Sequence, residues 1–165
     1  MHNVYVQLTD NELTDESIAR VIEQAVCAAL SYEKVDISCC VSVLVTDDDG
    51  IQEYNLKFRG IDTPTDVLSF PMQEFLGAGW ENHGDLDYDE NVSELPLGDI
   101  IISLESVNRQ ADEYENTVEY ELAYLTIHSM LHLLGYEHDN NESEKIMHQH
   151  TKYIIQEMDE YNNDK

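Results

Sequence analysis

The chain has 165 residues and a mass of 19.0 kDa, and hydrophobic residues make up 42% of it. This is sufficient for one domain with a hydrophobic core, so we expect residues 1–165 to form a single domain. The 35 acidic and 8 basic residues leave a formal net charge of −27, and such a surface repels nucleic acid at long range. Charge alone therefore argues against a nucleic-acid ligand. It fits a basic protein partner, and it fits an ordinary solvated acidic surface at least as well.

The sequence shows no targeting signal. The N-terminal stretch MHNVYVQLTDNELTDE has no basic segment followed by an apolar run, and about 18 consecutive apolar residues, the length of a membrane helix, occur nowhere. We therefore expect a cytoplasmic protein with no membrane partner. Cys27, Cys39 and Cys40 are odd in number, and in a strand the last two would point to opposite faces. We expect all three to be small core residues in a reducing compartment.

Short strands and amphipathic helices are predicted in the first half of the chain. Residues 4–8 alternate as a strand does. After Thr14, a candidate N-cap, apolar residues repeat at helical spacing and predict a helix with one buried face. These residues are Ile18, Val21, Ile22, Ala25, Val26 and Ala29. The stretch DISCCVSVLVT, residues 36–46, is rich in β-branched residues and predicts a second strand.

The middle of the chain continues this mixed order. The aspartates at 47–49 place anions at the start of a second helix, which Gly60 ends. Two more strands are predicted at 65–71 and 97–103, on either side of a long acidic segment from Pro71 to Pro96, and a third helix at 104–114. The sequence thus predicts an α+β fold, in which a small mixed β-sheet is covered by helices.

A fourth helix is predicted from Asn116 to Leu134, and it carries the chemistry. Asn116 and Glu119 resemble a capping box, and the apolar residues that follow lie on every side, which indicates a buried central helix. They are Leu122, Leu125, Ile127, Met130, Leu131 and Leu133. His128 and His132 are one turn apart and share a face. A left-handed residue at Gly135 would turn the chain so that His138 returns to the same point.

Three imidazoles that meet inside a protein must stay neutral or share a cation, because buried positive charges repel and lose hydration. Zinc takes nitrogen ligands at roughly 2.0–2.1 Å, and three histidines leave a fourth position for water, which is the catalytic arrangement. The alternative is three unrelated core or surface histidines. The spacing of His128, His132, Gly135 and His138 favours one metal, because it coincides with the metzincin pattern HExxHxxGxxH.

One position departs from that protease pattern. Proteases of the HExxH type use the glutamate after the first histidine as general base, and this chain has Ser129 there. A serine hydroxyl does not accept a proton near pH 7. Peptide hydrolysis therefore loses most of its support, although the metal geometry is retained.

Three separated motifs together resemble the YbeY family of rRNA maturation factors, which are single-strand-specific, metal-dependent endoribonucleases. The stretch HSMLHLLGYEHD is similar to that family's HGxLHLxGYDH motif, NLKFRGIDTPTDVLSFP lies upstream of it, and LGDIIIS lies between them. Ser129 stands where the family usually has glycine, and Glu137 where it usually has aspartate. Neither departure removes a ligand. The acidic segment between Pro71 and Pro96 is longer than the family needs.

The resemblance implies one Zn²⁺ held by His128, His132 and His138, and it places Arg59 in the active-site cleft. His128 and Arg59 are then the candidate catalytic residues. The guanidinium of Arg59 can bind phosphoryl oxygens and stabilise charge in the transition state. The alternative for Arg59 is an exposed residue that complements a helix dipole.

The function that the resemblance implies is cleavage of single-stranded RNA in rRNA maturation, at the 3′ end of 16S rRNA, and in ribosome quality control. The ribosome or its proteins are the expected partners, and DNA is not expected. Two alternatives remain open: a zinc hydrolase with a smaller substrate, and a ribosome-assembly factor whose metal is only structural.

Other side chains are weaker candidates. Asp99 and Asp139 could accept hydrogen bonds from the ligand imidazoles, or could be strand-end and turn residues. Trp80 and the tyrosines could stack on bases, although most tyrosines in a domain of this size complete the core. His148 and His150 are expected at the surface or boundary of a C-terminal helix that begins near Asn141.

Overall fold

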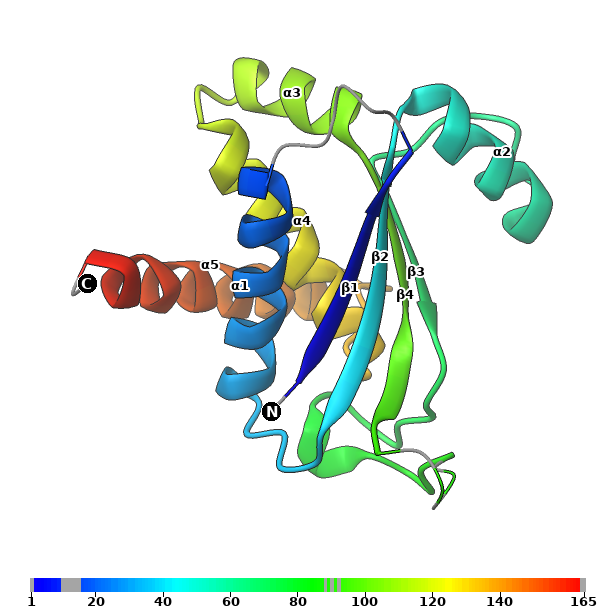
Figure 1. The fold of residues 1–165 in the computed structure, drawn as a ribbon, viewed down its shortest axis with the longest axis vertical. Coiled ribbons are helices and arrows are strands. Elements are labelled where there is room, and N and C mark those ends of the chain that lie inside the picture. The colour runs from blue at the N-terminus through cyan, green and yellow to red at the C-terminus, as the bar shows by residue number, and fades with distance from the viewer. Residues whose placement is uncertain (1, 10–15, 88, 90, 92, 164–165) are drawn as a thin grey trace.

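The computed structural model describes residues 2–9, 16–87, 89, 91 and 93–163. Helices and strands follow one another in mixed order, as the sequence predicts (Figure 1). In chain order they are β1 (Asn3–Leu8), α1 (Glu16–Tyr32), β2 (Cys39–Thr46), α2 (Asp48–Arg59), β3 (Val67–Pro71), the short 3-10 helix η2 (Trp80–Asn82), β4 (Leu95–Ser103), α3 (Leu104–Glu113), α4 (Val118–Leu133) and α5 (Asn141–Asn163). The candidate N-cap Thr14 lies outside the described residues.

The four strands form one mixed sheet in the order β1-β2-β4-β3. The first three are parallel, and β3 is antiparallel to β4. The predicted α+β fold with a small mixed sheet is confirmed. In the described part of the chain, no helix combines the length and the apolar character that crossing a membrane requires.

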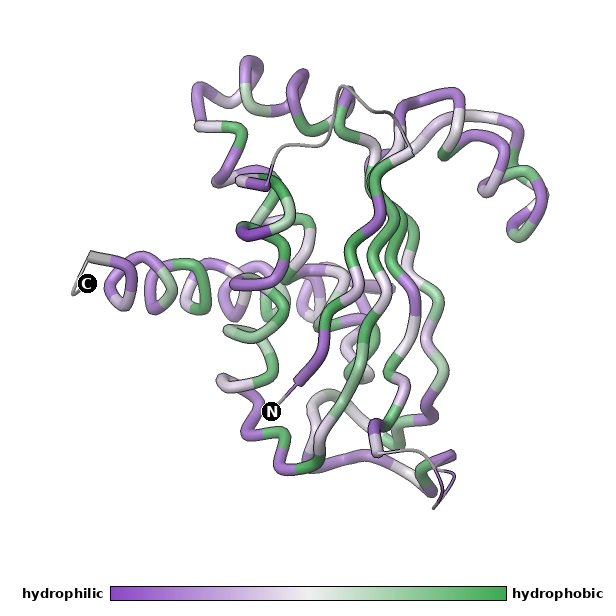
Figure 2. The backbone as a smooth tube through the Cα atoms, in the orientation of Figure 1, coloured by the Kyte–Doolittle hydropathy of each residue, from purple (hydrophilic) through white to green (hydrophobic). Residues whose placement is uncertain are grey.

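Helices cover both faces of the sheet, but unequally. Figure 1 shows α1, α4 and α5 on one side and α2 on the other. The larger core lies under α1 and α4, where Val43, Ile100 and Leu122 are buried. On the opposite face α2 buries Ile51 against Leu68 and Ile101. Hydrophobic residues accordingly concentrate in the strands and on the inward faces of the helices (Figure 2).

The two ends of α2 are formed by the residues that the sequence indicates. The Asp47 side chain accepts a hydrogen bond from the Gly50 backbone N–H, and Gly60 ends the helix at φ +71°. Asp48 then joins α2 to α3, because its carboxylate accepts hydrogen bonds from Ser103 and Ser106 and pairs with Arg109 at 2.6 Å. The start of α2 is therefore tied to the β4–α3 junction.

The N-cap of the central helix α4 lies one residue later than predicted. Thr117 is the N-cap, since its side chain accepts a hydrogen bond from the Tyr120 N–H. The capping box at Asn116 was therefore wrong: Asn116 instead donates its side-chain amide to Glu121, at 2.7 Å. The prediction of a helix buried on every side is confirmed, because ten of its residues are buried.

The prediction for the cysteines holds only in part. Cys39 is buried and Cys40 is half-buried, as alternation in a strand requires. Cys27 is exposed, which contradicts its assignment to the core. The reason is its position on α1, whose buried face contains Ala25, Val26 and Ala29, so that residue 27 points to solvent.

Candidate metal centre

The three histidines of the predicted motif converge at the C-terminal end of α4. His128 and His132 are half-buried on adjacent turns of that helix, and His138 is exposed in the segment between α4 and α5. One ligand-capable atom from each lies within 4.8 Å of the other two. The ring centroids are 4.5 to 5.6 Å apart. The convergence expected from the spacing is thus present.

The turn after α4 brings His138 back to the helix. Gly135 has φ +94°, and the backbone N–H of Tyr136 donates to the carbonyl of Leu131 at 2.9 Å, which closes the helix end. A side chain at position 135 would also collide with its surroundings, since a Cβ there would lie 2.5 Å from the Gly77 carbonyl oxygen. The close packing and the positive φ both require glycine at this point.

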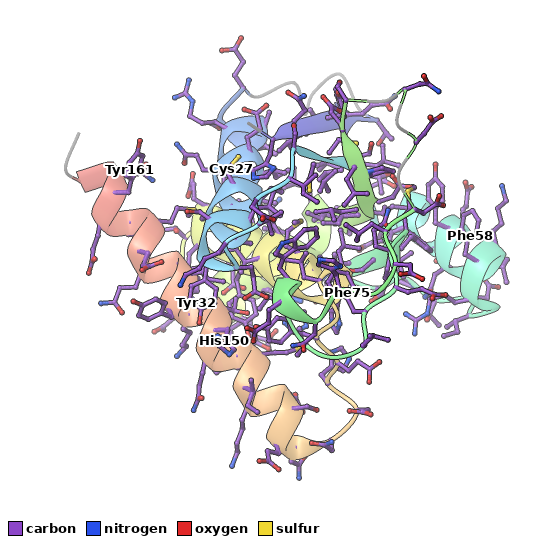
Figure 3. All side chains as sticks on the ribbon, turned by 90° about the horizontal axis from the view of Figure 1, so that it is seen from below. Cys27, Tyr32, Phe58, Phe75, His150 and Tyr161 are labelled. Atoms are coloured by element: carbon purple, nitrogen blue, oxygen red, sulfur yellow. The ribbon has the colours of Figure 1, made fainter. Side chains whose placement is uncertain are left out.

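The acidic segment supplies that close packing. Gly79 donates its backbone N–H to the Leu134 carbonyl at 2.9 Å, and Phe75 lies against Gly135. In Figure 3 Phe75 is labelled near the centre of the view, and Phe58 is labelled at one side of it, on α2. Trp80 in the same segment is buried and donates Nε1–H to Asp36 at 3.1 Å, so it is a core residue, not an exposed base-stacking one. The segment therefore supports the turn that carries His138.

A backbone carbonyl orients His132. Its Nδ1 lies 2.9 Å from the Tyr136 carbonyl oxygen, and a carbonyl can only accept a hydrogen bond. The proton of a neutral His132 therefore sits on Nδ1, and Nε2 keeps its lone pair. Metal-binding histidines are usually held in this way.

Burial favours the neutral form of His128 and His132. The pKa of His128 is lowered to about 4, first by burial and then by the neighbouring His132 and His138. Burial also lowers the pKa of His132. His128 Nδ1 is buried and has no hydrogen-bond partner in the described part of the chain, which is typical of a polar atom whose partner is an ion or a water. The nitrogen donors of three histidines, one of them buried and unpaired, fit a divalent metal.

Two further residues adjoin the histidines, and the sequence analysis missed both. The Asp66 carboxylate raises the pKa of His128, against the effect of burial. It accepts hydrogen bonds from the Val67 N–H and from Gln110, which hold it in place. The Tyr124 ring lies nearly parallel to His128, at 12° and 6.1 Å between centroids. Tyr124 precedes His128 by one helical turn, so its place was readable from helical periodicity, whereas that of Asp66 depends on the packing of β3.

Other candidate residues are not joined to this cluster. Arg59 is exposed in the last turn of α2 and, among the described residues, contacts none of the three histidines through a hydrogen bond, ion pair or ring contact. Asp99 shares a cavity with Tyr5 and Tyr54, by the sheet face that α2 covers. Asp139 accepts a hydrogen bond from Ser143 at 3.3 Å, next to the start of α5.

The C-terminal histidines lie where the sequence places them. His148 is exposed, and its Nδ1 is 2.6 Å from the Tyr124 hydroxyl. His150 is half-buried, and its ring contacts Tyr32 (Figure 3). The prediction of surface or boundary positions is confirmed for both.

Comparisons with known proteins identify the family of the chain. A family model described as Endoribonuclease YbeY matches residues 3–159. An Endoribonuclease YbeY from Caldicellulosiruptor saccharolyticus is 40% identical over 151 residues, covering 90% of this chain and 92% of that protein. One from Acetivibrio thermocellus is 41% identical over 148 residues, covering 89% and 90%.

A solved structure shows the same fold. The solution structure of TM1509 from Thermotoga maritima superposes with a TM-score of 0.62 at 28% identity, covering 98% of this chain and 93% of that one. The family model spans nearly the whole described chain, including the helix and turn that carry the histidines. The chain therefore belongs to the YbeY endoribonuclease family.

Proposed function

We propose that this protein is a zinc-dependent endoribonuclease that cleaves single-stranded RNA during rRNA maturation, including the 3′ end of 16S rRNA, and in ribosome quality control. The observation that carries the proposal is the group His128, His132 and His138, whose ligand-capable atoms lie within 4.8 Å of one another. Membership of the YbeY endoribonuclease family supports RNA as the substrate class.

The chain prepares each proposed ligand differently. The Tyr136 carbonyl fixes the tautomer of His132, burial keeps His128 neutral, and the turn at Gly135 positions His138. A zinc ion held there would act as a Lewis acid on a phosphoryl oxygen and would lower the pKa of a water to roughly 7. Asp66 places a fixed negative charge beside His128, which favours a cation at the site.

Arg59 is proposed to bind the phosphate that is cleaved. Its guanidinium offers paired N–H donors that match phosphoryl oxygens, and it is free to do so because the described residues give it no carboxylate partner. Its exposure on α2 means that substrate would have to bridge from α2 to the histidines. A single strand is flexible enough to follow such a path, which supports single-stranded RNA over duplex.

The acidity of the surface suggests how the substrate is reached. With a net charge of −27 the protein repels free RNA at long range. We infer that a basic protein partner, such as a ribosomal protein, offsets this repulsion and brings the enzyme to rRNA in the cytoplasm. Cleavage of protein-free RNA should accordingly be slow at low ionic strength and faster when a basic ribosomal protein is added.

The experiment combines metal analysis with a cleavage assay. The purified protein reconstituted with zinc should hold one ion per chain through nitrogen ligands, and it should cleave single-stranded RNA faster than the matched duplex. His132→Ala should abolish both properties. His83→Ala is the matched control, since His83 is exposed and lies outside the three-histidine group.

Four outcomes would overturn the proposal. Sulfur in the first shell by X-ray absorption, or no zinc bound after reconstitution, would remove the metal site. Zinc binding without RNA cleavage would leave a structural metal. Casein turnover that is lost in His132→Ala would reinstate a peptidase, which Ser129 disfavours because that position lacks a general base.

A further inference from the structure

A polar cavity lies beside the three histidines. Its volume is about 540 Å³, within the ~300–1,000 Å³ typical of ligand pockets. It is formed by the end of α3, the first half of α4 and the facing side of α5, and Figure 1 shows α3 leading directly into α4. We call it the tyrosine pocket, because Tyr114, Tyr120 and Tyr124 all line it. None of the three histidines lines it.

Tyr124 joins the pocket to the metal centre. It lines the pocket, and its ring lies nearly parallel to the His128 ring, with 6.1 Å between the centroids. His148 also lines the pocket, and its Nδ1 lies 2.6 Å from the Tyr124 hydroxyl oxygen. A strand whose phosphate lay at the histidines would therefore have its neighbouring nucleotide at this pocket.

The aromatic rings suit a base better than a phosphate. Tyr114 is 60% exposed and Tyr120 is half-buried, so each offers a ring face to a ligand. Base stacking on such rings contributes about 1–3 kcal/mol and tolerates any base. The carboxylates of Asp66 and Glu121 line the same cavity and would repel a phosphate from its interior.

Two side-chain amides that line the pocket use their N–H groups to bind the two carboxylates. Gln110 donates its amide to Asp66 at 3.1 Å, and Asn116 donates to Glu121 at 2.7 Å. These bonds leave the side-chain carbonyl oxygens of Gln110 and Asn116 without a partner in the described part of the chain. The exocyclic amino group of cytosine has two N–H donors, one for each of these oxygens, whereas uracil has only its N3–H and carries a carbonyl in place of the amino group.

One cation stands at the edge of the pocket. Lys152 is exposed on α5, lines the cavity, and forms no ion pair within the described residues. Basic residues are few in this chain, 8 against 35 acidic ones, so a lysine at the edge of this cavity is one of a small number of groups that can attract a phosphate. It is placed to contact the phosphate of a nucleotide whose base lies inside.

We propose that the tyrosine pocket binds one nucleobase of the RNA strand next to the cleaved phosphate, stacked on Tyr114 and Tyr120, and that it prefers cytosine over uracil. The inference rests on the proposed function for the identity of the strand. The preference follows from the acceptor oxygens of Gln110 and Asn116, and Lys152 contributes a contact that does not depend on sequence.

Binding is tested first without cleavage. Fluorescence anisotropy with the full-length protein in chelator, using labelled oligocytidylate and oligouridylate of equal length, gives Kd independently of the metal. Tyr114→Ala should weaken oligocytidylate binding by roughly 5- to 100-fold, and Tyr114→Phe should retain it because the ring remains. The matched control is Tyr5→Ala, an exposed tyrosine on β1 outside the pocket, which should leave Kd unchanged.

The base preference and the phosphate contact are tested separately. Wild-type protein should bind oligocytidylate roughly 2- to 10-fold more tightly than oligouridylate, the difference one hydrogen bond makes. The double variant Gln110→Met and Asn116→Ala should lose that preference. Lys152→Ala should weaken both oligonucleotides equally, while Lys145→Ala, on the same helix outside the pocket, should weaken neither.

The outcomes separate this inference from the proposed function. If the protein binds zinc and cleaves RNA but binds the two oligonucleotides equally and is unaffected by Tyr114→Ala, the pocket assignment is wrong and the endoribonuclease stands. If the cytosine preference and the Tyr114 effect are found without zinc-dependent cleavage, the pocket assignment holds and the proposed function fails.

Discussion

The Nδ1 atom of His132 lies 2.9 Å from the carbonyl oxygen of Tyr136, four residues further along the chain. That carbonyl is available because Gly135, at φ +94°, reverses the chain directly after α4. The same reversal brings His138 to within 4.5 Å of His132, measured between ring centroids. One glycine thus sets both the tautomer of one proposed ligand and the position of another.

Gly135→Ala should therefore damage stability and metal binding together. An alanine at this position would be strained by the positive φ, and its Cβ would collide with Gly77 and Phe75. We therefore expect a loss of about 3 kcal/mol or more in the free energy of unfolding. Urea unfolding in chelator measures this, and a zinc titration measures the affinity.

The matched control is Gly60→Ala at the end of α2. Gly60 also has a positive φ, +71°, but a Cβ there would have nothing within 4 Å. Its loss should be only about 1–2 kcal/mol, from backbone conformation alone, with zinc affinity unchanged. Equal losses in the two variants would show that the contact with the acidic segment contributes nothing.

His138→Ala and Arg59→Ala should separate metal binding from phosphate binding. His138→Ala removes one of three ligands, so zinc affinity and the zinc-dependent rise in melting temperature should fall together. Arg59→Ala should leave both nearly unchanged, yet reduce cleavage of single-stranded RNA by a factor on the order of 10² to 10³, as loss of one transition-state donor does.

Thermal melts with and without chelator, a zinc titration and a cleavage rate decide this for wild type and both variants. Loss of zinc in Arg59→Ala, or an unchanged cleavage rate, would remove Arg59 from the active site. It would then be an exposed cation at the C-terminal end of α2, where it complements the helix dipole.

The Asp48–Arg109 pair should make stability depend on acid. The hydrogen bonds from Arg109, followed by those from Ser103 and Ser106, lower the pKa of Asp48 below its ordinary value of 3.8. Its contribution to folding is therefore complete above about pH 3.8 and is lost as pH falls through the lower folded-state pKa. The effect is small, because solvent screens this exposed pair.

Asp48→Asn tests this in urea unfolding from pH 7 to pH 3. The variant should be less stable than wild type at pH 7, and the difference should shrink below pH 3.8. Asp49→Asn, an exposed neighbour on the same turn, should show no such loss. A difference between wild type and Asp48→Asn that stays constant down to pH 3 would rule out the charge as its origin.

Ser129→Ala should stabilise the protein. The Ser129 side chain is fully buried, and its hydroxyl has no hydrogen-bond partner within the described residues, so its removal relieves a desolvation penalty of about 1 kcal/mol. Ser106→Ala, which deletes a buried hydroxyl that donates to Asp48 at 3.0 Å, should destabilise instead. Chemical denaturation measures the change in the free energy of unfolding for each variant. A loss of stability in Ser129→Ala would reveal a partner for its hydroxyl.

Local chemistry in the sequence determined the elements of this fold and the three histidines. Helical periodicity showed that α4 is buried on every side and that His128 and His132 share a face, and the glycine after them predicted the return of His138. These features depend on residues within about three turns of one another, so patterns of spacing are enough to find them. The cap at Thr117 was missed by one residue, because Asn and Thr are both good N-caps and only the backbone geometry chooses between them.

Long-range packing decided the rest. Asp66 influences His128 electrostatically only because the sheet places the start of β3 on the side of α4, and the acidic segment supports Gly135 only because it folds back against the turn after α4. The tyrosine pocket joins residues of α3, α4 and α5 to Asp66, which precedes β3, so its lining spans 86 positions from Asp66 to Lys152. Side chains that distant in sequence meet only when the whole sheet and its covering helices have assembled, since it is burial of the shared core, and no local preference, that fixes their relative positions.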